Sequence, residues 1–184
     1  ALLSMRLEKN FPTWFAELRS IYGPFEAGMD FFIKLDKESF IGKQAAIQEF
    51  ENGPTLKRVS LIIEADDADV IADEPIWARV GDKEFKHINK PHGLGPTRFD
   101  ADGKAQQKQT EKQTRDGDWS VVGWVTSGGY AHTVKLSMAQ GYLPAELASD
   151  ESEGFFEIEI LGKRHPARIS IDAPFDPTGS RMRS

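Results

Sequence analysis

After residue 54 the chain is built from short segments in which apolar side chains recur at every second position. The pattern is clearest at Val59, Leu61 and Ile63 and again at Phe156, Ile158 and Ile160. It predicts strands that bury one face, and Gly162-Lys163 predicts a hairpin turn after the second of them. Further apolar runs predict strands at residues 76–80, 85–88, 120–126 and 134–138. Many short strands with no long helix among them predict a closed antiparallel barrel or a sandwich.

The first 52 residues follow other patterns. Leu3 and Leu7 lie one turn apart, which predicts a short helix at residues 1–9 with both leucines facing a core. Alternation at residues 31–35 predicts a strand, and residues 41–51 predict a second helix.

The pair Gly53-Pro54 ends that second helix and marks the expected domain boundary. Residues 1–52 are predicted to be the C-terminal portion of an α+β domain, and residues 53–184 a β-barrel domain. The predicted fold class is therefore α+β followed by all-β. Residues 98–118 are polar and without periodicity, which predicts a mobile loop.

Composition excludes several classes of protein. The net charge of −6 argues against nucleic acid as the main partner, because phosphate binding depends on Lys and Arg. No run approaches the ~20 consecutive apolar residues that a membrane span requires. The lack of cysteine excludes disulfides and cysteine nucleophiles, and it agrees with the cytoplasmic location that we expect.

Candidate ligands for a metal or a flavin are poorly spaced. His87 and His92 are separated by a proline in a predicted loop, which is a poor geometry for a shared metal ion. The acidic run from Glu64 to Glu74 lacks the spacing and the glycine of an EF-hand. Gly93-Leu94-Gly95 lacks the third glycine of a dinucleotide fingerprint. We therefore predict no metal site and no flavin site in this chain.

Several motifs resemble those of one enzyme family. In chain order they read Met5-Arg6-Leu7-Glu8-Lys9, Pro24-Phe25-Glu26-Ala27-Gly28, Lys34-Leu35-Asp36-Lys37, Gly123-Trp124-Val125-Thr126-Ser127-Gly128 and Ala139-Gln140-Gly141-Tyr142. The tail from Asp176 to Arg183 is similar to the ending of the dehydrogenase-fused branch. Together they resemble the C-terminal region of the glycine-cleavage T-protein (aminomethyltransferase) family, in particular the folate-binding part of sarcosine and dimethylglycine dehydrogenases.

The resemblance implies the end of a folate-binding α+β domain followed by an aminomethyltransferase-type antiparallel barrel. It implies transfer of a one-carbon (methylene) unit to tetrahydrofolate. The expected donor is a small methylated amine or a lipoyl-carried aminomethyl group, and FAD is expected only if an upstream dehydrogenase domain exists.

The family's catalytic aspartate has no counterpart in this chain. We therefore expect no catalytic residue here and no activity from the chain alone. The first residues lack an initiator methionine and look like the middle of a helix, so we also expect a missing N-terminal partner segment of the same protein.

Arg6 is the main candidate for binding folate. The resemblance implies that its guanidinium lines the folate cavity, where paired hydrogen bonds hold a carboxylate or a pterin carbonyl. The alternative is a helix-surface arginine, or one paired with Glu8 or Asn10. Glu26 lies in another of the motifs and is also included among the folate-binding residues, as a buried partner of Arg6.

Three further residues complete the predicted site or its surroundings. Glu8 lies in the Arg6 motif and is included among the folate-binding residues. Arg181 could bind the anionic glutamate tail of folate, or it could belong to a frayed C-terminus. Trp14 is predicted to pack in the core rather than to stack on a pterin. Without the missing partner segment, however, residues 1–52 are expected to expose Trp14, Phe15, Phe31 and Phe32.

A second function from a different class stays open. The barrel could be a non-catalytic structural or interaction module that docks a flavoprotein dehydrogenase. In the first function the chain is an enzyme fragment, and in the second it only holds other domains together. The upstream sequence would discriminate between them. A dinucleotide fingerprint there would favour a dehydrogenase fusion, and a folate half without the family aspartate would favour the non-catalytic function.

Overall fold

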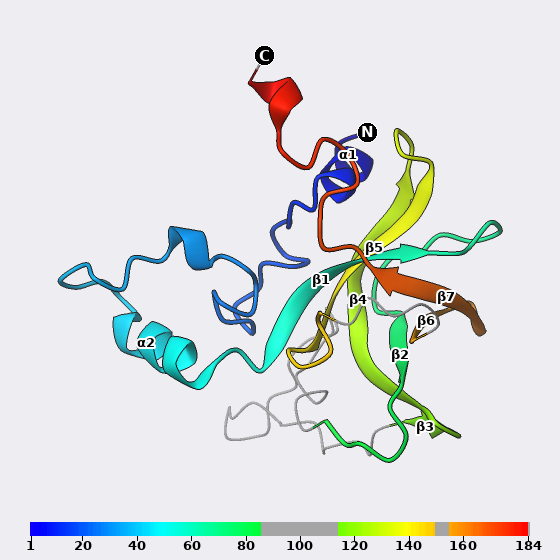
Figure 1. The fold of residues 1–184 in the computed structure, drawn as a ribbon, viewed down its shortest axis with the longest axis horizontal. Coiled ribbons are helices and arrows are strands. Elements are labelled where there is room, and N and C mark those ends of the chain that lie inside the picture. The colour runs from blue at the N-terminus through cyan, green and yellow to red at the C-terminus, as the bar shows by residue number, and fades with distance from the viewer. Residues whose placement is uncertain (86–113, 150–154, 184) are drawn as a thin grey trace, which may run out of the picture.

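A closed barrel of antiparallel strands forms the main body of the protein. The computed structural model describes residues 1–85, 114–149 and 155–183. Hydrogen bonding follows the order β2-β6-β7-β1-β5-β4, and β4 pairs with β2 to close the ring. The bounds are Leu56–Ile63 for β1, Pro75–Arg79 for β2, Trp119–Ala131 for β4, Leu136–Pro144 for β5, Phe156–Ile160 for β6 and Lys163–Ile169 for β7. The predicted barrel is confirmed (Figure 1).

The remaining elements are short. Strand β3 (Arg115–Asp116) extends the sheet beside β4. The helices are α1 (Leu2–Glu8) and α2 (Lys43–Asn52), with 3-10 turns η1 (Asp30–Phe32) and η2 (Ser180–Met182). None of the helices in the described ranges is long and apolar enough to cross a membrane.

The inner face of the barrel carries the main hydrophobic core. Alternate residues of each strand point inward, among them Val59, Leu61, Ala139, Leu143 and Phe156. Because the side chains alternate, the intervening residues of β1, β5 and β4 point outward. That outer face is polar at Arg58 and Ser60 on β1, Gln140 and Tyr142 on β5, and Thr126 and Ser127 on β4.

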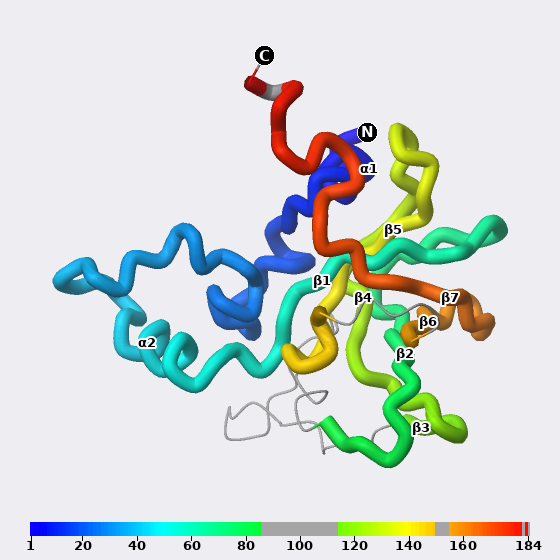
Figure 2. The backbone as a smooth tube through the Cα atoms, in the orientation of Figure 1, coloured from blue at the N-terminus to red at the C-terminus, as the bar shows by residue number. Residues whose placement is uncertain are grey.

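The N-terminal segment covers this polar outer face. Leu7 of α1 packs with Ala131 and Met138 of the β4–β5 hairpin. The C-terminal tail runs beside α1, where Phe175 N donates to Glu8 O at 3.0 Å and Lys9 pairs with Asp176 at 3.4 Å (Figure 2). The polar layer is therefore enclosed between the barrel wall and the first residues of the chain.

Residues 10–52 form an irregular arm. Its first part packs on the barrel through Glu17 and Tyr22, and its outer part, which carries η1 and α2, extends away from the barrel (Figure 1). The strand predicted at residues 31–35 is wrong, because η1 occupies this position and Phe31 is 78% exposed. None of the strands in the described ranges pairs with this segment, and alternation alone does not produce extended structure. The expected exposure of Phe15, Phe31 and Phe32 is confirmed.

Both predicted helices are present, but one of the two leucines expected to face a core does not. The helix at residues 1–9 is α1, and the one at residues 41–51 is α2. Leu7 is buried as expected, but Leu3 is 66% exposed, so the expectation that both leucines face a core is wrong. The barrel contacts only one side of α1 and leaves Leu3 outside this contact.

Several strand predictions change in extent. The strand expected at residues 120–126 continues to Ala131, and the one expected at residues 134–138 is β5, which continues to Pro144. The strand predicted at residues 85–88 and the loop predicted at residues 98–118 lie largely outside the described residues. Within the latter, Arg115 and Asp116 form β3, so this end of the predicted loop is a strand.

Close packing against neighbouring atoms explains the two glycines of the motif at residues 123–128. A Cβ at Gly128 would lie 2.1 Å from a methyl group of Val70, and Gly128 belongs to β4. A Cβ at Gly123 would lie 2.1 Å from the carbonyl oxygen of Tyr142.

We expect Gly123→Ala to lower the free energy of unfolding by about 1–3 kcal/mol, since β4 and β5 must separate to admit the methyl group. Urea unfolding of the chain would measure this loss. An unchanged urea midpoint would show that there is room for a methyl group between Gly123 and the Tyr142 carbonyl.

Candidate functional site

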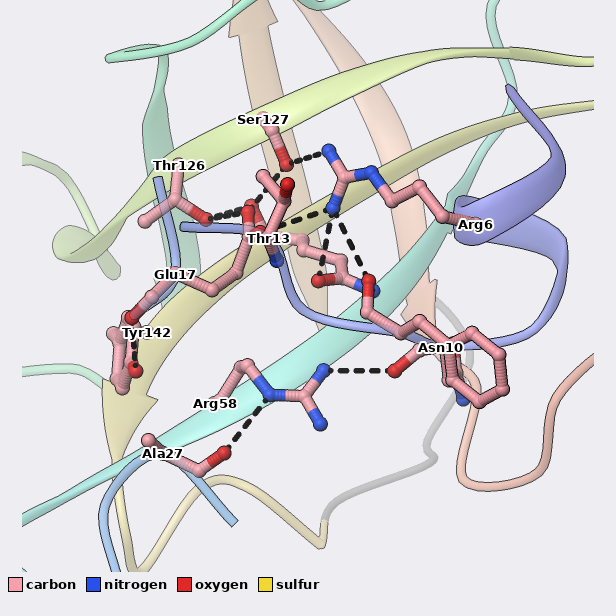
Figure 3. Close-up of polar contacts among 11 residues, drawn as sticks. Arg6, Asn10, Thr13, Glu17, Ala27, Arg58, Thr126, Ser127 and Tyr142 are labelled. Atoms are coloured by element: carbon pink, nitrogen blue, oxygen red, sulfur yellow. Dashed lines mark hydrogen bonds and ion pairs between the residues drawn. The ribbon is translucent and has the colours of Figure 1, made fainter. Parts of the chain in front are cut away.

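Charged and hydroxyl-bearing side chains meet where α1 and the following loop cover the outer face of β4 and β5. We call this set the Arg6–Glu17 layer and define it as Arg6, Glu17, Thr126, Ser127 and Gln140 (Figure 3). Glu17 and Gln140 are fully buried, and Arg6 is 8% exposed. Buried polar groups of this kind are stable only when they are hydrogen-bonded to one another.

Arg6 reaches the layer from the last turn of α1. Its Nη1 donates to Glu17 Oε2 at 3.0 Å and to Gln140 Oε1 at 3.2 Å, and its Nη2 donates to Ser127 Oγ. Leu7, next along α1, is anchored against the β4–β5 hairpin, which fixes the direction in which Arg6 leaves the helix. The alternatives of a surface arginine, or one paired with Glu8 or Asn10, are wrong.

Glu17 comes from a tight loop between Thr13 and Leu18. Thr13 N donates to Glu17 Oε2 at 2.8 Å, and Glu17 N donates to Thr13 O at 3.2 Å. Phe15 takes a left-handed conformation with φ of 66°, which an aromatic residue rarely adopts. The loop thus turns Phe15 outward and Glu17 inward.

A β-bulge places two hydroxyl groups on the same face of β4. The register between β4 and β5 shifts between Val125 and Ser127, where Ser127 pairs with Gln140. Two residues of a bulged strand then lie opposite one residue of its partner. Thr126 Oγ1 donates to Glu17 Oε1 at 2.7 Å, and Ser127 Oγ donates to the same oxygen.

One donor in the layer is left over. Arg6 Nε is buried and has no hydrogen-bond partner among the described residues. Such buried unpaired donors are rare in folded proteins and call for an explanation. The layer can therefore offer one more N–H to an acceptor that is not part of this chain's described structure.

Two tyrosines and Arg58 continue the layer along the barrel wall. The rings of Tyr22 and Tyr142 stack with centroids 3.6 Å apart, and Tyr142 OH donates to Glu17 O at 2.8 Å. Burial raises the pKa of Tyr22 to about 12, and burial also raises the pKa of Tyr142 above its ordinary value. Both phenols are therefore neutral at physiological pH.

Arg58 is held by two backbone carbonyls. Its Nε donates to Ala27 O at 3.1 Å and its Nη1 to Asn10 O at 3.2 Å. Burial lowers the pKa of Arg58 from its usual value, although an arginine remains charged at physiological pH. A second fixed cation thus lies beside the loop that begins at Asn10.

Glu8 and Glu26 are buried, but neither pairs with Arg6. Glu8 Oε1 accepts from Thr133 N at 2.6 Å, which ties α1 to the β4–β5 turn. Glu26 accepts from Gly23 N, Leu56 N and Thr55 Oγ1 at 3.1, 3.2 and 2.6 Å. The expected pairing of Glu26 with Arg6 is wrong, because Glu17 occupies that position.

Arg181 lies away from the layer, in η2 near the end of the C-terminal tail (Figure 1). Its guanidinium carbon lies 5.1 Å from the centroid of the Phe175 ring, and its backbone N–H donates to Asp176 at 3.4 Å. The tail is thus folded rather than frayed at this residue. The structure does not bring Arg181 beside Arg6.

Sequence reasoning assigned no role to Glu17, Ser127 or Gln140. Glu17 is an acidic residue within an apolar stretch, and Gln140 is an amide within an apolar strand, so each carried a detectable signal of polar burial. The prediction that Trp14 packs in the core is wrong, since it is 74% exposed. The loop that buries Glu17 turns Trp14 to solvent.

Histidine and carboxylate side chains do not gather into a metal centre in the part of the chain that the structure describes. His165 is buried on β7, with Nδ1 3.3 Å from Glu64 O. His87 and His92 lie outside the described residues, so their prediction is not tested.

A family comparison defines the class of barrel. Residues 97–176 match the family model described as the glycine cleavage T-protein C-terminal barrel domain. The resemblance predicted from the motifs is therefore confirmed, and the closed barrel is of the T-protein type.

Individual relatives match this chain over a part of their own length. It is 32% identical to "Dimethylglycine dehydrogenase, mitochondrial" of Rattus norvegicus over 186 residues, which cover 99% of this chain and 17% of the relative. It is 26% identical to "Aminomethyltransferase" of Exiguobacterium sibiricum, covering 94% of this chain and 36% of the relative. The chain thus spans between 17% and 36% of the length of these two curated relatives.

A solved structure supports the fold. The glycine cleavage system aminomethyltransferase T from Bartonella henselae superposes with a TM-score of 0.65 over 95% of this chain and 38% of that protein. Sequence identity between the two is 18%, so the likeness concerns the fold alone.

Proposed function

We propose that the complete polypeptide containing this chain transfers a one-carbon (methylene) unit from an amine donor to tetrahydrofolate. Arg6 carries the proposal, because its guanidinium is buried beside the barrel and one of its donors is unpaired. An aminomethyltransferase and a dimethylglycine dehydrogenase among the relatives support it. In this proposal the chain closes the folate site, and the rest of the polypeptide supplies catalysis.

The residues of the layer fit a folate-type ligand. The pterin ring of folate presents a carbonyl beside ring nitrogens, and the glutamate tail of folate ends in carboxylates. Both ends of the ligand therefore offer acceptors to a guanidinium. Arg6 would bind such an acceptor directly. Glu8 and Glu26 would act by fixing α1 and the start of β1, since their carboxylates are occupied by backbone donors. Arg181 would contact only a ligand that extends to the tail.

Other parts of the reaction lie outside this chain in the proposal. The donor is a small methylated amine or a lipoyl-carried aminomethyl group, and FAD enters only with an upstream dehydrogenase domain. The N-terminal part of the same protein is the main partner, and we infer that this chain alone is inactive. The division into residues 1–52 and 53–184 stays a prediction. So does the cytoplasmic location, since the rat relative is named as mitochondrial.

We expect Arg6→Ala in the complete polypeptide to weaken tetrahydrofolate binding by at least about tenfold, since hydrogen bonds to a charged group contribute roughly 1.5–3 kcal/mol. Calorimetric titration with tetrahydrofolate would measure this. Circular dichroism at the titration temperature would verify that the variant is folded.

Arg168→Ala is a matched control, because Arg168 is an exposed arginine on β7. It should bind folate as the parent does. Equal affinity of the Arg6→Ala variant and the parent would refute the assignment of Arg6.

A non-catalytic docking module is the second candidate, and the exposed aromatic residues of the arm favour it. Trp14, Phe15, Phe31 and Phe32 are all exposed, and apolar side chains that are exposed together, as the rings of Phe31 and Phe32 are with centroids 5.4 Å apart, are typical of interaction surfaces. An upstream folate half that lacks the family aspartate would support this function over the first.

A further inference from the structure

The two ends of the Arg6 guanidinium differ in how they are occupied. Glu17 Oε2 accepts from Nη1, Ser127 Oγ accepts from Nη2, and Ser127 in turn donates to Glu17 Oε1. These three side chains form a closed ring of hydrogen bonds across the Nη1–Nη2 end. Gln140 Oε1 takes a further Nη1 hydrogen at 3.2 Å.

The side edge of the guanidinium has one unpaired donor, Nε–H. A guanidinium carries five N–H groups in a rigid planar fork, and Nε–H lies on its side edge. Nε is buried and has no hydrogen-bond partner among the described residues. Arg6 as a whole is more than nine-tenths buried. In a protein interior an unpaired donor is costly, so the edge is suited to a ligand that brings an acceptor.

We propose that Glu17 is a positioning residue that occupies the Nη1–Nη2 end of Arg6 and thereby presents the Nε edge to the ligand. The ligand chemistry is a planar acceptor, either a carboxylate or the carbonyl edge of a lactam. This inference rests on the proposed folate function and extends it by naming the binding edge and the residue that sets it.

Glu17 is suited to this role because it is anchored independently of Arg6. Thr13 N donates to its carboxylate at 2.8 Å, and Thr126 Oγ1 does so at 2.7 Å. Its backbone carbonyl accepts from Tyr142 OH at 2.8 Å. The carboxylate is therefore held by its own loop and by β4, and its backbone by β5, independently of Arg6, which is what precise positioning of a binding group requires.

Side-chain NMR of the 184-residue chain tests the geometry without any ligand. In the parent, rotation of the Arg6 guanidinium about Nε–Cζ should be slow, with separate Nη signals, because both Nη atoms are held. We expect Glu17→Gln to speed this rotation by about tenfold or more, because it removes a charge-assisted hydrogen bond.

Glu49→Gln is the matched control. Glu49 is also a carboxylate of the N-terminal segment that accepts backbone hydrogen bonds, from Phe25 N and Glu26 N at 3.1 and 2.9 Å. It should leave the Arg6 signals unchanged. An unchanged rotation rate in Glu17→Gln, or an equal change in both variants, would overturn the inference.

Calorimetry of the complete polypeptide with tetrahydrofolate tests the consequence for binding. Glu17→Gln should weaken binding by about tenfold while Glu49→Gln does not, and Glu17→Asp should recover part of the loss if the charge is what matters. Full affinity in Glu17→Gln would overturn the positioning role. A parent that binds no folate would refute the proposed function instead, and the NMR comparison would still decide whether Glu17 sets the edge.

Discussion

Replacing Glu17 with alanine is expected to lower the free energy of unfolding by about 3–5 kcal/mol, because it leaves a buried charge without its partner. Glu17 is fully buried, and its carboxylate accepts from Arg6, Thr13 N and the hydroxyls of Thr126 and Ser127. All of these donors would lose the Glu17 carboxylate together, and Arg6 would keep only uncharged acceptors such as Gln140 Oε1. Urea unfolding of the chain, followed by tryptophan fluorescence, would measure the loss.

A double-mutant cycle separates the ion pair from the rest of the network. Arg6→Ala alone should also destabilise, since it leaves Glu17 as an uncompensated buried carboxylate. The double variant removes both charges and should be more stable than the sum of the two losses predicts, with a coupling of roughly 1–3 kcal/mol. Strict additivity would show that the two side chains do not interact in solution.

Replacing Phe156 with alanine is expected to cost about 3–5 kcal/mol, which is the usual range for an aromatic residue removed from a core. Phe156 is fully buried in the barrel, and its ring packs edge-on against Phe155 with centroids 4.8 Å apart. Its two cross-strand neighbours are Ala78 and Ala167, whose short side chains cannot fill the space. The cavity would therefore persist, and the loss should lie in the upper part of the range.

An exposed phenylalanine provides the control for this measurement. Phe31 is on the arm, and truncating a surface side chain usually changes stability by less than about 0.5 kcal/mol. Phe31→Ala should therefore unfold at nearly the parent's urea midpoint. Similar losses in both variants would mean that the arm, rather than the barrel, limits stability.

The candidate site could be predicted from sequence only at Arg6, through the motif around it. Glu8 and Glu26 were identified as motif residues, and their burial is now observed, but their partners are backbone N–H groups and the Thr55 hydroxyl rather than Arg6. The partners of Arg6 could not be predicted, because Ser127 and Gln140 lie 121 and 134 residues away along the chain. Only closure of the barrel brings them to α1.

The barrel strands β1 and β6 were determined by the sequence itself, because a strand that buries one face must repeat apolar side chains every second residue, and this pattern is local. Tertiary structure alone decided three other features. The first is the bulge that turns Thr126 and Ser127 to one face, and the second is the loop that buries Glu17 and exposes Trp14. The third is the absence of the strand expected at residues 31–35. Each depends on which distant segment supplies a hydrogen-bond partner. Such partners are chosen by the packing of the whole chain, whereas local patterns specify only which side of a segment is apolar.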